Sequence, residues 1–98
     1  MDVMSVEVVD DRDRHRYVAR VDGADAGFLA YQLADNVAIS LIHTQVDPAY
    51  EGHGVGSALA RFALDDARRR SWAVRVLCPF VSSWLERHPD YDDLSIRR

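Results

Sequence analysis

Three glycines stand close together in the middle of this 98-residue chain, at positions 52, 54 and 56. They follow an apolar stretch over residues 37–46 and open a segment with helical periodicity. Glycine lacks the side chain that would keep a ligand away from the backbone, and a helix that begins there has unpaired N–H groups at its first turn. The pattern predicts a strand–loop–helix unit whose loop binds phosphate oxygens.

Hydrophobic periodicity predicts strands before this loop and a helix after it. Alternating residues and turn signals predict an antiparallel meander of four strands, over residues 7–10, 15–22, 28–33 and 37–46. The turns between them are expected at residues 10–14, 22–27 and 34–36. Asp47 and Pro48 should end the fourth strand, because proline has no backbone donor for a strand ladder.

Beyond the glycines, the period changes to that of a helix over residues 54–70, with an apolar face formed by Val55, Ala58, Leu59, Phe62, Ala63 and Ala67. A fifth strand over residues 71–77 should run parallel to the fourth, and residues 80–88 form a second helix with an apolar stripe. The expected fold is α/β (α+β), a mostly antiparallel five-stranded sheet with two main helices in one compact domain over residues 1–98.

Composition excludes several classes of function. The net charge is −4 and all twelve basic residues are arginine, clustered only at residues 68–70, so a nucleic-acid partner is not expected. Asp65 and Asp66 precede Arg69 and Arg70 by four residues, which is typical of a solvated helix end. No stretch approaches the roughly 20 apolar residues of a membrane span, and residues 1–7 lack a signal peptide's features. We therefore expect a cytoplasmic protein, and the absence of lysine suggests a bacterial source.

Neither a disulfide nor a metal site is expected. Cys78 is the chain's single cysteine, and its four histidines have no metal-ligand spacing. A Rossmann dinucleotide site also fails, because Ser57 stands where the third glycine is needed and residues 77–79 hold no acid for a ribose. A P-loop fails because no Gly-Lys-Ser/Thr follows.

The strand, the loop and the helix together resemble the GCN5-related N-acetyltransferase (GNAT) family. Residues 51–56 (Glu-Gly-His-Gly-Val-Gly) align with the family's Arg/Gln-x-x-Gly-x-Gly/Ala pattern, with Glu51 in place of arginine or glutamine. The Leu-Cys-Pro-Phe segment at residues 77–80 is similar to that of the small YjdJ-type members, and the resemblance extends from about Val6 to Tyr91. It implies acetyl-CoA as cofactor and an amine as acceptor.

The resemblance also implies which residues bind the cofactor. Backbone amides at the loop and the start of the helix would hold the pyrophosphate, from His53, Gly54, Val55, Gly56 and Ser57. Backbone groups of Gln45 and Val46 would pair with the pantetheine arm. The alternative for these glycines is a tight turn with no ligand.

Two residues are candidates for catalysis. Cys78 precedes Pro79, which suits a first helical turn, so its thiol should lie at a helix N-terminus, where the dipole favours a thiolate. Three roles remain open for Cys78: the acid for the leaving group, an acyl acceptor, or a buried apolar residue without a catalytic role. His43 is a general base or a surface histidine, since imidazoles exchange protons near neutral pH. His88 and Tyr91 belong to the acceptor site or to the packing.

The leading functional hypothesis is an acetyl-CoA-dependent N-acetyltransferase. One alternative is an acetyl-CoA-binding module with little or no turnover, and another is a small thiol-based domain without affinity for coenzyme A. The acceptor is a small molecule or a protein, and the chain is a monomer or a homodimer.

Overall fold

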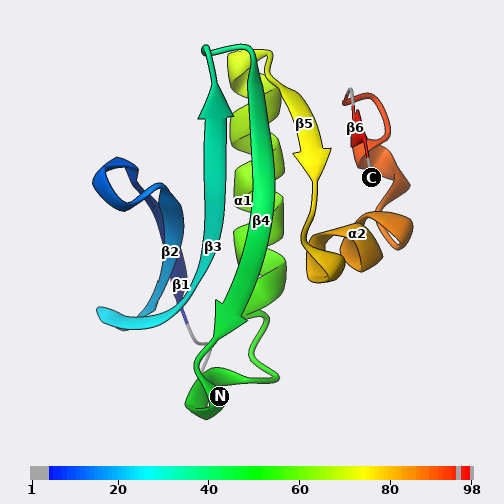
Figure 1. Ribbon diagram of the computed structural model, residues 1–98. Helices are drawn as coiled ribbons and strands as arrows, with labels where there is room; N and C mark the ends of the chain where they lie inside the picture. The colour runs from blue at the N-terminus through cyan, green and yellow to red at the C-terminus, as the bar shows by residue number, and fades with distance from the viewer. Residues whose placement is uncertain (1–4, 95, 98) are drawn as a thin grey trace.

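The computed structural model describes residues 5–94, 96 and 97. A six-stranded sheet lies at its centre, with the strands side by side in chain order (Figure 1). The strands are β1 (Val6–Asp11), β2 (Arg16–Val21), β3 (Ala24–Ala34), β4 (Ala38–Val46), β5 (Ala73–Val76) and β6 (Ile96–Arg97).

The first four strands pair antiparallel, whereas β5 pairs parallel with β4 and β6 pairs parallel with β5. The predicted meander and the parallel fifth strand are confirmed. The two-residue strand β6 was not predicted and extends the sheet beyond β5.

Two tight hairpin turns connect the antiparallel strands. Asp22 and Gly23 have φ values of 51° and 84°, and Asp35 and Asn36 have φ values of 50° and 57°. Two successive left-handed residues are typical of the type I′ turn, whose twist matches that of the strands it joins. The first turn is shorter than predicted, because β3 already begins at Ala24.

Two helices pack on the sheet, α1 (Val55–Arg70) and α2 (Pro79–Glu86), and short 3₁₀ turns occur at Arg12–Arg14, Pro48–Tyr50 and Pro89–Tyr91. Figure 1 shows α1 running behind β3 and β4 along one face of the sheet. Leu59, Ala63 and Ala67 of its predicted apolar face are fully buried, and so are Ala60 and Leu64, which were not predicted. No described helix covers the opposite face of the sheet, which we call the uncovered face.

A cluster of hydrogen-bonded polar side chains centres on the buried carboxylate of Asp66 in α1. The Tyr17 hydroxyl donates to Asp66 Oδ2 at 2.8 Å, and Arg70 Nε donates to Asp66 Oδ1 at 3.1 Å, as does Arg69. Burial and this hydrogen bond raise the pKa of Tyr17 well above its usual range. Arg68–Arg70 are exposed as predicted, but Asp66 is only 3% exposed and belongs to the core.

None of the helices in the described part of the chain has the length and apolar character needed to cross a membrane.

Candidate functional site

Strand β4 changes its surroundings halfway along its length. Residues 38–41 pair with β3 on one side and with β5 on the other. In the register with β3, Ala30 lies opposite His43 and Tyr31 lies opposite Leu41, so Ile42 is an extra residue that forms a β-bulge. The Leu41 carbonyl accepts hydrogen bonds from Leu77 N (2.8 Å) and Cys78 N (3.1 Å), the two residues before α2. Beyond this point the segment that follows β5 leaves β4 and enters α2.

Residues 43–46 of β4 therefore have a strand partner only on the β3 side among the described residues. We call their other side the open edge, and Figure 1 shows β4 and β5 separating there. Asp47 N donates to Ala26 O, next to β3. Because successive residues of a strand direct their backbone groups to opposite sides, Gln45 faces β3, whereas Thr44 and Val46 face the open edge. The sequence predicted Gln45 and Val46 for the pantetheine arm, and Thr44 only as a residue that hydrogen-bonds within the site or suits a strand, because no residue type marks the bulge.

The glycine loop leads from this edge into α1. Gly52 and Gly54 have φ values of 82° and 78°, and a side chain at either position would meet nothing within 4 Å. Gly54 caps α1, and the first helical hydrogen bond runs from Ala58 N to Gly54 O at 2.9 Å. The N–H groups of residues 55–57 thus have no partner within the helix. His53 N differs, since it donates to Tyr50 O at 3.4 Å.

The third glycine has a different role from the first two. A Cβ atom on Gly56 would lie 2.6 Å from the far end of the Phe80 ring, which is 40% exposed, so glycine lets this ring pack against the first turn of α1 and a larger residue would displace it. Gly52 and Gly54 need glycine because of their left-handed φ values. The number of glycines is therefore explained without a ligand, and the evidence for a ligand lies in the open space above the backbone.

A pocket of about 390 Å³ occupies that space. It brings together five of the predicted cofactor residues, Val46, Gly54, Val55, Gly56 and Ser57, and adds Tyr50, Glu51, Gly52 and Phe80. No basic side chain lines it, and Glu51 supplies its one carboxylate. A bound anion would therefore be stabilised by backbone N–H groups and the α1 dipole rather than by an arginine.

Cys78 lies where β4 and β5 part, directly before α2, as predicted. Its side chain is 2% exposed, and Sγ lies 3.2 Å from Thr44 Oγ1. Either atom can be the donor of this contact. The two residues are 34 positions apart in sequence, so only the fold reveals that Thr44 is the neighbour of the thiol.

His43 does not approach Cys78. It is exposed and lies across from Ala30, next to Phe28, with ring centroids 6.2 Å apart. Thr44 lies across from Leu29, which is fully buried under α1. Directly opposed residues share a face, so His43 is on the uncovered face and the Thr44–Cys78 pair is on the α1 side.

The other polar candidates belong to the packing. The His88 ring stacks on Trp84 with centroids 3.7 Å apart, and its Nδ1 lies 2.7 Å from Trp84 O. Tyr91 is buried and donates to Asp65 Oδ1 at 2.7 Å; burial and this hydrogen bond raise its pKa. Trp84 is fully buried and donates to Ser57 Oγ at 2.7 Å, which ties α2 to the first turn of α1.

No group of three His, Cys, Asp or Glu side chains that could hold a metal ion occurs within residues 5–94, 96 and 97.

Comparison with known proteins adds three findings to this geometry. A family model described as GCN5-related N-acetyl-transferase matches residues 16–94. Protein NATD1 of Bos taurus is 29% identical over 85 residues, which cover 86% of this chain and 75% of that protein. The NMR solution structure of a GCN5-like putative N-acetyltransferase from Staphylococcus aureus aligns with a TM-score of 0.67 at 21% identity, over 99% of this chain and 91% of that one.

A second solved structure has the same fold. The ribosomal-protein-alanine N-acetyltransferase from Brucella melitensis biovar Abortus 2308 aligns with a TM-score of 0.66 at 20% identity, over 89% of this chain and 91% of that one. At these identities the two structures support the fold alone. The NATD1 proteins compared are from vertebrates, so the bacterial source stays a prediction. The cytoplasmic location also stays a prediction.

Proposed function

Because the chain belongs to the GCN5-related N-acetyltransferase family, we propose that it transfers an acetyl group from acetyl-CoA to an amine. Family and fold support acetyl transfer in general, and the donor and the acceptor are our proposal. The observation that carries it is the pocket at the start of α1, which adjoins the open edge of β4 through Val46.

The residues of this pocket suit a pyrophosphate. The N–H groups of Val55, Gly56 and Ser57 are free of helical partners, and the open space above Gly54 lets an anion approach them. Each phosphate oxygen would accept from these donors near the positive end of the α1 dipole. Glu51 is exposed, so its carboxylate can point away into solvent.

The open edge suits an extended amide chain such as pantetheine. The backbone N–H and C=O groups of Thr44 and Val46 lack a β5 partner, and a bound chain with amide groups would complete the ladder. This proposal replaces Gln45 by Thr44, because the backbone groups of Gln45 face β3.

Acetyl-CoA would supply the acetyl group as a thioester: the amine nitrogen bonds to the carbonyl carbon, the carbon–sulfur bond breaks, the amine loses a proton and the leaving thiolate gains one. The thiol of Cys78 lies beside the end of the open edge, and we assign it as the acid that would give this proton. Thr44 Oγ1 would fix the direction of the thiol. We favour the acid role over the acyl-acceptor role, since a thiol with 2% exposure has little room for a covalent adduct.

His43 would act from the other face of the sheet. Its exposed imidazole lies beside the bulge at Ile42, where it could take the proton from an amine that enters over the uncovered face. Acid and base on opposite faces of one strand would keep the two proton transfers apart.

The alternative, an acetyl-CoA-binding module with little turnover, is favoured by the burial of Cys78. It predicts the same affinity for acetyl-CoA and no product from any amine. Product formation therefore distinguishes the acetyltransferase from the binding module. Binding of acetyl-CoA distinguishes both of them from a glycine loop that is only a structural turn.

Calorimetric titration with acetyl-CoA tests the proposed cofactor site. Gly54→Asp places a carboxylate in the cradle and should lower the affinity for acetyl-CoA at least tenfold. Gly23→Asp is the matched control, because Gly23 also has a positive φ (84°) and free space around it but lies in the β2–β3 turn. Equal affinities of the two variants would reject the cradle, and NADH tests its selectivity.

A further inference from the structure

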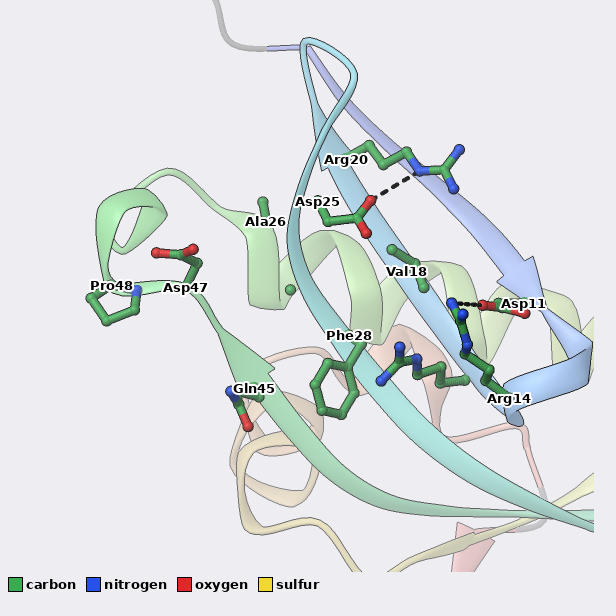
Figure 2. A pocket seen from close by; sticks show the side chains of 12 residues that line it. Asp11, Arg14, Val18, Arg20, Asp25, Ala26, Phe28, Gln45, Asp47 and Pro48 are labelled. Atoms are coloured by element: carbon green, nitrogen blue, oxygen red, sulfur yellow. Dashed lines mark hydrogen bonds and ion pairs between the residues drawn. The ribbon is translucent and has the colours of Figure 1, made fainter.

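A second pocket lies on the uncovered face of the sheet, away from the cradle. Its volume is about 270 Å³, and its walls come from the end of β1 and the turn after it, from β2 and β3, and from the end of β4. Figure 2 shows Phe28 among the lining side chains, with Gln45 and Asp47 toward β4 and Arg20 paired with Asp25 farther up. The pocket combines one aromatic ring with several charged groups, as small-molecule sites commonly do.

Three arginines line this pocket, and two of them are neutralised. Arg14 pairs with Asp11 at 3.5 Å, and Arg20 pairs with Asp25 at 3.2 Å. Arg16 lies between them in sequence and has no carboxylate within salt-bridge distance in the described part of the chain. Asp11, Asp25 and Asp47 also line the pocket, and Asp11 lies across from Arg16 in the β1–β2 register, but none of these carboxylates forms an ion pair with Arg16.

The Nε–H group of Arg16 is also buried without a hydrogen-bond partner. It is the only such side-chain atom among the described residues. A buried donor without an acceptor is costly, and native proteins that retain one commonly use it. A ligand with an acceptor oxygen would satisfy it after a small shift of the guanidinium, because less than 1 Å² of Nε is exposed.

Phe28 fixes this guanidinium beside the proposed acceptor entrance. Arg16 Cζ lies 4.7 Å from the centre of the Phe28 ring, and the His43 ring centre lies 6.2 Å from the same ring. In the strand register, Arg16 lies opposite Ala30, and Ala30 lies opposite His43. Ala30, with its small side chain, is thus the one residue between the cation and the proposed base in this row, and the pocket itself lies on the Phe28 side of it.

We propose that Arg16 and Phe28 form a carboxylate-binding subsite, so that the acceptor is a small amine bearing a carboxylate a few bonds from its nitrogen. Arginine pairs with a carboxylate through two parallel hydrogen bonds, which a neutral amide cannot reproduce. The subsite orients the amine toward His43 and the open edge of β4. Its role as an acceptor subsite rests on the proposed acetyl transfer, but its affinity for a carboxylate does not.

Benzoate provides a direct probe, because it has the ring and the carboxylate but no amine to acetylate. We expect benzoate to shift the ¹⁵N–¹H signal of Arg16 Nε in a saturable manner, with the signal assigned by its loss in Arg16→Gln. Benzamide, its neutral counterpart, should bind at least tenfold more weakly. Absence of a shift, or equal affinities for the two compounds, would overturn the subsite.

Matched variants separate the subsite from a general effect of charge. Arg16→Gln should weaken benzoate binding at least tenfold, whereas Arg20→Gln, which removes an arginine already held by Asp25, should change it less than twofold. Equal weakening by both variants would overturn the assignment to Arg16. Circular dichroism of both variants verifies that the fold is retained.

An activity assay then links the subsite to the acceptor. With acetyl-CoA as donor, phenylalanine should give a kcat/KM at least tenfold above that of phenethylamine, and Arg16→Gln should abolish the difference. If phenethylamine is equally good, the subsite does not serve the acceptor. If no amine is acetylated while benzoate still binds at Arg16, the proposed acetyl transfer fails and the carboxylate site stands.

Discussion

The two halves of β4 share β3 on one side and differ completely on the other. In residues 38–41, β5 completes the ladder, and Ile39 and Leu41 are fully buried under α1. In residues 43–46, the β5 side is open, and His43 and Gln45 are exposed on the uncovered face. The same strand is thus a scaffold where it has two neighbours and a candidate binding edge where it has one.

This difference separates stability from function along one strand. We call residues 38–41 the closed half and residues 43–46 the open half. Substitutions around the closed half should lower the free energy of unfolding and leave ligand binding unchanged. Substitutions around the open half should weaken ligand binding and leave the free energy of unfolding unchanged. Cys78, at the boundary between the halves, should show both effects, and in the other predictions below the two effects occurring together would break this division.

The largest effect is expected at Cys78, where the two halves meet. If its thiol is the acid for the leaving group, Cys78→Ala should lower kcat by about 10²-fold, the lower end of what general acids contribute. The affinity for acetyl-CoA should stay within twofold of that of the unchanged protein. Steady-state kinetics and calorimetry measure the two quantities.

Val76→Ala is the matched control for this variant. Val76 is buried like Cys78 and ends β5, so its truncation also removes core contacts but carries no thiol. Both variants should unfold at lower urea concentrations, and only Cys78→Ala should lose its rate. A Cys78→Ala enzyme with full kcat would assign the residue to the core alone.

A smaller effect is expected at Asp66 of α1, which accepts a hydrogen bond from Tyr17 of β2. Asp66→Ala leaves the Tyr17 hydroxyl without its acceptor, which should lower the free energy of unfolding by about 1–3 kcal/mol. Asp93→Ala removes the exposed partner of Arg68 and should have a much smaller effect. Urea titrations measure both, and equal losses would show that burial does not decide the strength of these ion pairs. Acetyl-CoA affinity should be unchanged in each variant.

The outline of both halves of β4 was largely predictable from the sequence, and the bulge that separates them was not. Asp47 and Pro48 correctly marked the end of β4, and period-2 alternation gave the antiparallel meander, because local chemistry decides both. The bulge at Ile42 follows from the strand register with β3, and no residue type in β4 indicates it.

The site shows the same division. The glycines predicted the loop before α1, but the packing of Gly56 against Phe80, 24 positions later in the chain, could not be predicted from them. The Thr44–Cys78 contact, the burial of Asp66 and the unpaired Arg16 all depend on which elements pack together. Periodicity identifies which face of a helix or strand is apolar. It does not identify which polar side chains of other elements will contact that face.

The smallest predicted effect is a pH dependence in the buried cluster. Burial alone would raise the pKa of Asp66, but the hydrogen bonds from Tyr17, Arg70 and Arg69 outweigh it and hold the pKa below its ordinary value of 3.8. The stabilisation from this carboxylate is therefore fully present above that value and is lost as the pH falls through the lower pKa of the folded state. The difference in unfolding free energy between the unchanged protein and Asp66→Ala should stay constant from about pH 7 to 5 and shrink below about pH 4. Urea titrations across this range measure it, and a difference that persists undiminished in acid would assign the stabilisation to packing around Asp66 rather than to its charge.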